Sequence, residues 1–195
     1  MKLFTATQKI LRSALLLVAV SVSLSACETT EINTRSATTL PIKVGKVLVI
    51  YEMGNLDKHI APTAVEVPAE GKVRMAESLG KAVQQRIPAG LETKGIATEF
   101  VLLTDDKAQP PANTSATHTV RIRAYKDVQV CKENGMCTHR LSVRASVLRT
   151  GSGAVLWSTE FEEPAMSPLA IDSRRFESLA QNILYSVSWV LRSAP

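Results

Sequence analysis

Residues 118–149 have the sequence HTVRIRAYKDVQVCKENGMCTHRLSVRASVLR, and this stretch decides the fold. Its apolar residues alternate with polar ones, at even positions in the first half and at odd positions in the second: Val120, Ile122, Ala124, Leu141, Val143, Ala145 and Val147. Because successive side chains of a strand point to opposite faces, this period of two predicts two half-buried antiparallel strands, 118–130 and 139–149. The Asn-Gly pair between them is typical of a tight hairpin turn.

Cys131 and Cys137 flank that turn. In an oxidising compartment an even pair of cysteines predicts a disulfide, which here would staple the tip of the hairpin and stabilise it by roughly 2 kcal/mol. A metal site made of Cys131, Cys137 and His139 is the alternative. Zinc sites usually have four ligands and tighter cysteine spacing, and no fourth ligand stands nearby, so the disulfide is favoured and no metal is expected.

Pairing Cys131 with Cys137 conflicts with the alternation of apolar residues. In that register the numbers of partner residues sum to 268, so the even-numbered apolar set could not lie opposite the odd-numbered one. A slip of one residue moves every side chain to the other face of the sheet. We therefore expect a β-bulge near Lys126 and Asp127.

The flanking segments complete an α+β domain. The predicted order is β-α-β-β-β-β-α, with strands 44–51, 96–103, 118–130, 139–149 and 154–162 and helices 69–87 and 173–192. We expect a mixed or antiparallel sheet of about five strands, covered by the two helices. Pro88 should end or kink the first helix, and Gly95 suits the cap that follows it.

The second helix has an apolar face that should cover the sheet, while Tyr185 and Trp189 lie on its opposite side. These two residues, four positions apart and near Arg192, are a candidate partner-binding site, because Trp, Tyr and Arg are favoured in binding hot spots. The alternative is that a loop such as 52–68 packs over the aromatic pair.

The chain begins like an exported protein. Lys2, Lys9 and Arg12 precede an apolar run of about ten residues, too short for a membrane span of roughly 20. Residues 24–27, Leu-Ser-Ala-Cys, resemble the bacterial lipobox, which implies that residues 1–26 are a signal peptide and that Cys27 carries diacylglycerol. A plain signal peptide cut after Ala26 is the alternative.

Lipidation at Cys27 would divide the chain into three parts. We expect the lipidated cysteine and a flexible tether over residues 27–42, followed by a single periplasmic domain over residues 43–195. In the lipoproteins that the segment resembles, an aspartate after the lipidated cysteine tends to retain the protein at the inner membrane. This chain has Glu28 there, which favours the outer membrane, facing the periplasm, over the inner membrane. Acyl chains on the cysteine would anchor the protein to that membrane.

The positive charge of the chain belongs largely to its first segment. Of the 23 lysines and arginines, three lie in residues 1–26, which leaves 20 against 18 acidic residues. The remainder has no run of basic residues, so a nucleic-acid partner is not expected.

Four segments carry a resemblance to small periplasmic lipoproteins with a TolB N-terminal-like fold: VGKVLVIYEMGN (44–55), RMAESLGKAVQQRI (74–87), GIATEF (95–100) and ASVLRTGSGAVLWSTEF (145–161). That group includes the penicillin-binding-protein activator and curli-secretion lipoproteins. The resemblance implies the fold more than the function, and the cysteine-closed hairpin departs from it.

No motif indicates an enzyme or a cofactor. The three histidines have no recognisable nucleophile or metal partner, and neither a Gly-x-Ser-x-Gly elbow nor a His-Glu-x-x-His helix is present, although a site of scattered residues is not visible in a sequence. We therefore expect a non-catalytic accessory or scaffold that binds an envelope protein in a cell-envelope assembly or secretion complex. The alternative is a lipid- or small-ligand-binding lipoprotein auxiliary to an envelope transporter, which requires a deep apolar pocket between sheet and helices.

Overall fold

The structure is a computed structural model of the chain. It describes residues 30–53, 57–60, 69–104, 111, 113–131, 137–162 and 173–194. Residues 1–29, which contain the expected signal peptide and Cys27, lie outside the described residues.

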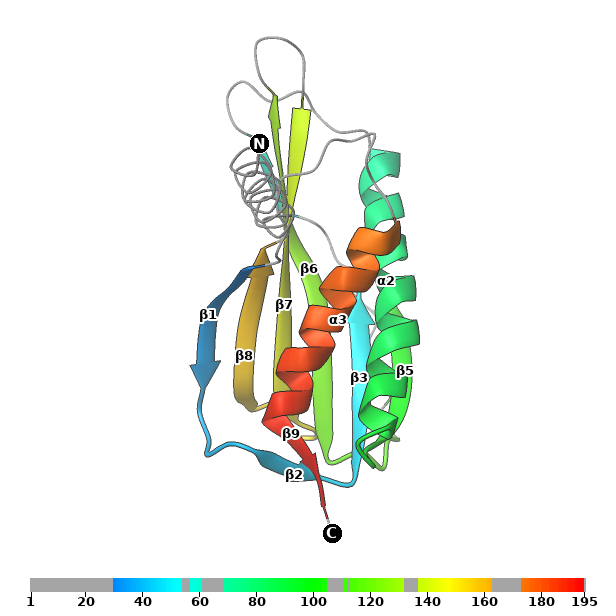
Figure 1. Cartoon of the computed structure of the whole chain (residues 1–195), viewed down its shortest axis with the longest axis vertical. Coiled ribbons are helices and arrows are strands. Elements are labelled where there is room, and N and C mark those ends of the chain that lie inside the picture. The colour runs from blue at the N-terminus through cyan, green and yellow to red at the C-terminus, as the bar shows by residue number, and fades with distance from the viewer. Residues whose placement is uncertain are drawn as a thin grey trace, which may run out of the picture.

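One mixed sheet forms the body of the domain, and two helices lie across one of its faces (Figure 1). The strand order is β1-β8-β7-β6-β3-β5, with β4 pairing further along β6. The sheet strands are β1 (Thr30–Ser36), β3 (Lys46–Glu52), β4 (Asp57–Ile60), β5 (Ala97–Leu103), β6 (His118–Cys131), β7 (Cys137–Arg149) and β8 (Val155–Glu162). The helices are α2 (Ala69–Glu92) and α3 (Ser173–Val190).

The predicted α+β class and the order β-α-β-β-β-β-α are confirmed by β3, α2, β5 to β8 and α3. Strand β3 runs parallel to both β5 and β6, whereas β6, β7, β8 and β1 are successively antiparallel. Two additional short strands, β2 (Ile42–Val44) and β9 (Leu191–Ser193), form a separate parallel pair below the main sheet in Figure 1.

The core lies between the sheet and the two helices. The apolar positions predicted for α3 are all buried: Phe176, Leu179, Ile183, Leu184, Val187, Val190 and Leu191. They pack against the inward-facing side chains of the strands, which include Val120, Ile122, Val143 and Val147. The period of two in the hairpin and the helical stripe in α3 therefore meet in one continuous core.

The register of the hairpin agrees with the predicted bulge. Val120 lies opposite Val147, a pairing whose residue numbers sum to 267, while Cys131 lies opposite Cys137, whose numbers sum to 268. The shift falls between Ala124 and Lys126, one residue before the expected position. Tyr125 is thus the extra residue that allows both pairings at once.

The structure differs from the sequence prediction at three boundaries. Helix α2 continues through Pro88 to Glu92, because Ile87 and Leu91 on either side of the proline are both buried in the core. Gly95 forms the expected cap with a φ of 74°. Helix α3 ends at Val190, so Arg192 belongs to strand β9.

The third difference concerns the expected tether over residues 27–42. Thr30–Ser36 forms edge strand β1, which pairs with β8. The segment has no apolar alternation, and it joins the sheet through backbone pairing and contacts between polar side chains. Thr34 Oγ1 lies 2.8 Å from Thr159 Oγ1 on β8.

Glycines let the helices approach their neighbours closely. A Cβ atom on Gly80 of α2 would lie 2.9 Å from Cε1 of Tyr51, and one on Gly90 would lie 2.2 Å from Cδ2 and 3.0 Å from Cγ of Leu184. Gly90 is therefore the point at which α3 packs directly on the backbone of α2.

A Gly90→Val substitution should destabilise the domain by about 2 kcal/mol, because overpacking a filled contact forces shifts of side chains and backbone. Gly45→Val is the matched control, since a Cβ atom there meets nothing within 4 Å. Urea denaturation followed by circular dichroism measures both variants. Equal stability of the two would contradict the close packing of α2 on α3.

Candidate functional site

The face of the sheet opposite the helices carries a polar row that crosses four strands. Arg121 of β6 lies opposite Ser146 of β7, Ser146 lies opposite Ser158 of β8, and Ser158 lies opposite Arg35 of β1. Neighbouring strands are about 4.8 Å apart, so the two arginine Cα atoms are separated by roughly 14 Å. Two short hydroxyl side chains thus form a floor with an arginine at each end.

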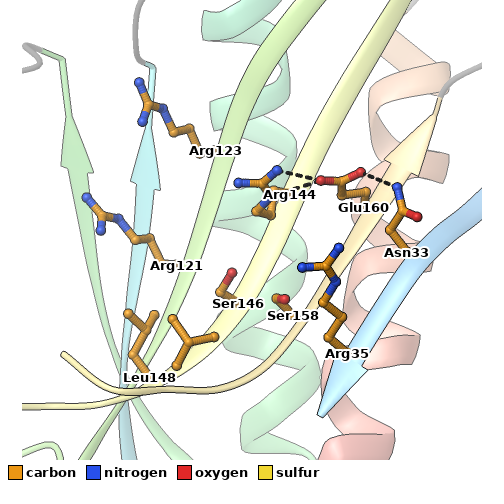
Figure 2. Close-up of a pocket in the computed structure, with 10 residues that line it drawn as sticks. Asn33, Arg35, Arg121, Arg123, Arg144, Ser146, Leu148, Ser158 and Glu160 are labelled. Atoms are coloured by element: carbon orange, nitrogen blue, oxygen red, sulfur yellow. Dashed lines mark hydrogen bonds and ion pairs between the residues drawn. The ribbon is translucent and has the colours of Figure 1, made fainter. Parts of the chain in front are cut away.

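A hollow of about 360 Å³ opens over this row. Figure 2 shows Ser146 and Ser158 at its centre and the arginines around them. Its lining residues are Asn33, Arg35, Arg121, Arg123, Arg144, Ser146, Leu148, Val155, Ser158 and Glu160. The hollow exists because serines occupy the centre of the row, where longer side chains would fill the space.

Two carboxylates, Glu52 and Glu160, hold three of the four arginines in place. Arg121 Nε donates to Glu52 Oε1 at 2.6 Å, and Arg123 Nε lies 3.9 Å from the other oxygen, Oε2. Arg144 Nε donates to Glu160 Oε1 at 3.1 Å, and Asn33 Nδ2 donates to Glu160 Oε2 at 2.8 Å. Such ion pairs contribute little to stability when they are solvated, so their main effect is to orient the arginines.

The arginines remain partly open to solvent although they are oriented. The side chains of Arg121, Arg123 and Arg144 are 46%, 47% and 51% exposed, whereas that of Glu52 is only 11% exposed. Four arginines line or border the hollow against two glutamates, Glu52 and Glu160, which leaves an excess of two positive charges. The arrangement can hold an anion in a fixed place, since guanidinium groups match the geometry of carboxylates and phosphates.

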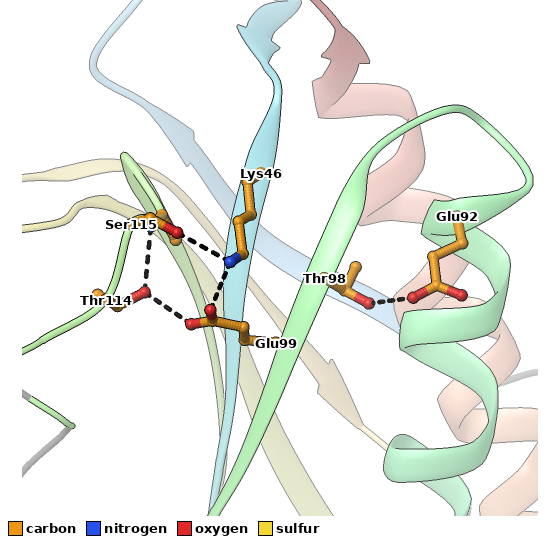
Figure 3. A network of polar contacts seen from close by, with 7 residues as sticks. Lys46, Glu92, Thr98, Glu99, Thr114 and Ser115 are labelled. Atoms are coloured by element: carbon orange, nitrogen blue, oxygen red, sulfur yellow. Dashed lines mark hydrogen bonds and ion pairs between the residues drawn. The ribbon is translucent and has the colours of Figure 1, made fainter.

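A second polar network borders the same face at the edge formed by β3 and β5 (Figure 3). Lys46 Nζ contacts Glu99 Oε1 at 2.5 Å and donates to Ser115 Oγ at 2.8 Å, while Thr114 Oγ1 donates to Glu99 Oε2 at 2.8 Å. These bonds fix residues 113–117 beside the small apolar cluster of Leu48, Ile50, Leu103 and Ala116. The hydrogen bonds from Lys46 and then Thr114 lower the pKa of Glu99 below its ordinary value of 4.5.

The aromatic pair predicted on α3 is exposed. Tyr185 is 73% and Trp189 59% exposed, so no segment among the described residues packs over them. Both lie on one stripe of the helix, four residues apart. Arg192 is also exposed, but it lies in β9, opposite Lys43 of β2, and not on the helical face that carries the aromatic pair.

The structure describes the backbone of two of the three cysteines. Cys131 and Cys137 are backbone partners in the hairpin, as the disulfide prediction requires, but their side chains lie outside the described residues, so the disulfide stays a prediction. Cys27 lies outside the described residues as well.

Within the described residues, no group of three or more histidines, cysteines, aspartates or glutamates is placed to hold a metal ion. His118 contacts Thr117 through Nδ1, and burial, assisted by the positive charge of Arg149, lowers its pKa. Burial also raises the pKa of the Tyr51 hydroxyl in the core.

In the described part of the chain, buried side chains occupy the space between sheet and helices. Val120, Ile122, Val143, Leu179 and Ile183 are all fully buried there. Both hollows described here, the one above Ser146 and Ser158 and another lined by Leu48 and Ile50, open on the opposite face.

The sequence contained one signal for the arginine row. Arg121 and Arg123 alternate with Val120, Ile122 and Ala124, so the period of two places them on the face opposite the core, and Arg144 and Ser146 alternate with the apolar residues of the next strand in the same way. Their gathering into one hollow depends on the register and on Arg35, which the expected tether left outside the domain. Neither follows from alternation alone.

No protein-family model and no curated protein matches this chain. Among solved structures it is similar to the PelC dodecamer from Paraburkholderia phytofirmans, with 15% identity, a TM-score of 0.43 and coverage of 85% of this chain and 100% of that chain. It is also similar to a neuraminyllactose-binding hemagglutinin homolog from Helicobacter pylori, with 10% identity, a TM-score of 0.47 and coverage of 78% and 89%.

A third similar structure is a DUF330 protein from Xanthomonas campestris, with 14% identity, a TM-score of 0.43 and coverage of 83% of this chain and 91% of that chain. At identities and TM-scores this low, the similarities carry no argument about function.

Lys46→Met should raise the pKa of Glu99 toward 4.5, because it removes the first cause of the lowering. A carboxylate with a lowered pKa contributes stability above its unfolded pKa and loses it as the pH falls through its folded pKa. The stability deficit of Lys46→Met should therefore be present at pH 7 and shrink in acid.

A carbon-13 NMR titration of Glu99 and thermal melts at neutral and acidic pH measure these two effects. Lys94→Met, which removes an exposed lysine elsewhere, is the control. An unchanged Glu99 titration in Lys46→Met would refute the role of the network.

Proposed function

We propose that this chain is a membrane-anchored periplasmic lipoprotein that acts as a non-catalytic accessory or scaffold in a cell-envelope assembly or secretion complex. The observation that carries the proposal is the exposed aromatic pair of α3. Large aromatic side chains that a domain leaves in solvent, on a helix whose other side is fully packed, suit a protein partner.

The arrangement of the two ends supports a protein partner over the membrane itself. Only three residue steps separate Cys27 from Thr30, the first residue of β1, so a lipid on Cys27 would hold the start of that strand within roughly 10 Å of the bilayer. Strand β1 begins about midway up the sheet in Figure 1 and runs downward, and α3 also runs downward and finishes at the lower end, where β9 pairs with β2. The last turns of α3, which contain Tyr185 and Trp189, would therefore lie toward the end of β1 that is farther from the proposed anchor.

The short distance between the start of β1 and the bilayer also changes the expected position of the domain. With Thr30–Ser36 held in the sheet, the domain would sit close to the membrane surface instead of standing off on a long tether. No described helix is long and apolar enough to cross a membrane. The outer membrane, facing the periplasm, remains the proposed location.

A ligand-binding lipoprotein auxiliary to an envelope transporter was the alternative. It requires a deep apolar pocket between sheet and helices, and core side chains occupy that space in the described part of the chain. The filled core therefore favours the accessory role.

Tyr185→Ala together with Trp189→Ala should remove the reproducible partner from crosslinked envelopes, because truncating hot-spot aromatics commonly costs more than tenfold in affinity. Crosslinking with mass spectrometry, with the wild type as reference, measures the loss. The melting temperature should stay unchanged, since both side chains are exposed.

The control is Ser178→Ala with Gln181→Ala, two exposed positions on the same stripe of α3. Its crosslinks should match those of the wild type. Cys27→Ser should move the protein from the membrane fraction to the soluble periplasmic fraction, which tests the anchor separately. Failure to find any reproducible partner of the wild type would count against the accessory role.

A further inference from the structure

The hollow above Ser146 and Ser158 has no part in the proposed function, and its chemistry is specific. We propose that it is a binding site for a small oxyanion, a ligand with phosphate or carboxylate groups, held by Arg35 above Ser146 and Ser158, with Arg121 adding positive charge on the side facing β3. The inference is independent of the anchor and of the aromatic pair.

The side chains around the hollow carry a net positive charge. The site has an excess of two positive charges, and a ligand with two negative charges would balance them. Glu52 is nearly buried and contacts both Arg121 and Arg123, so it lies beneath the arginines and does not fill the hollow itself. The arginines keep about half of their surface in solvent, which is where an anion would approach.

The sheet fixes the positions of the residues that form the row. The row Arg121, Ser146, Ser158, Arg35 is fixed by backbone pairing across four strands, so the arginines and the hydroxyls between them keep their spacing without a ligand. A site that is already arranged loses little conformational entropy on binding. The serine hydroxyls can donate to an anion oxygen at the floor while the Arg35 guanidinium donates from the side. The Arg121 side chain extends toward β3, where it contacts Glu52, so it acts on the anion through its charge (Figure 2).

The described lining of the hollow contains no aromatic side chain. None of its described residues is Phe, Tyr or Trp, so the hollow has no ring on which a sugar or a nucleobase could stack. Only Leu148 and Val155 offer apolar contact. The hollow would therefore recognise the charged oxygen atoms of a ligand, and not an aromatic ring or an apolar group.

Isothermal titration calorimetry on the purified full chain tests this with three probes. Inorganic pyrophosphate represents a soluble phosphate, glycerophosphoglycerol represents the headgroup of an anionic lipid without its acyl chains, and citrate represents a carboxylate ligand. The probe that binds most tightly at low salt assigns the source of the anion. Binding should weaken when the salt rises to physiological concentration, because the Debye screening length falls to about 8 Å.

Arg35→Ala with Arg121→Ala should weaken binding of the best probe by at least about tenfold, because it removes one charge-assisted contact and a second positive charge beside the hollow. The matched control, Arg86→Ala with Lys94→Ala, removes the same charge from exposed positions on and after α2 and should bind like the wild type. Equal losses in both double variants would overturn the proposal, as would a wild type that binds none of the three probes.

Ser158→Asp provides a second variant that keeps every arginine. It places a carboxylate on the floor of the hollow and should abolish probe binding while the circular dichroism spectrum stays that of the folded protein. Undiminished binding by folded Ser158→Asp would equally overturn the proposal.

Discussion

The pairing of Val120 with Val147 across β6 and β7 is the constraint on which the rest of the structure depends. Because the side-chain period of a strand is two, this register sends the valines toward α2 and α3 and sends Arg121 and Ser146 to the opposite face. A shift by one residue would bury arginines under the helices and expose the core. The bulge at Tyr125 confines the register of the cysteine pair to the far end of the hairpin, where it does not disturb the core.

The same division separates two kinds of surface. On the helical side, α3 uses one stripe to seal the core and leaves Tyr185 and Trp189 in solvent. On the open side, serines at the centre of a cross-strand row leave room for a hollow, and Glu52 and Glu160 orient three of its four arginines. The two surfaces face different directions, so a partner on α3 and an anion on the sheet could be bound together.

Local periodicity predicted the parts of the fold that depend on it. The alternation in β6 and β7 and the apolar stripe of α3 identified the core, and the conflict between the cysteine pair and that alternation located the bulge within one residue. Strand β1 escaped prediction because Thr30–Ser36 has no apolar pattern and is held by pairing with β8. Pro88 was a misleading signal, since packing of Ile87 and Leu91 outweighs the hydrogen bond that proline cannot make. The arginine hollow needed three registers at once, and no single segment contains that information.

Chemical-shift mapping of backbone amides during a titration with pyrophosphate tests the central claim, that the sheet register divides a closed helical face from an anion-binding open face. The changes should concentrate at Arg35, Arg121, Ser146 and Ser158, which lie on four different strands, while the amides of α2 and α3 stay unchanged. Shifts centred on Tyr185 and Trp189, or spread evenly over both faces, would contradict it.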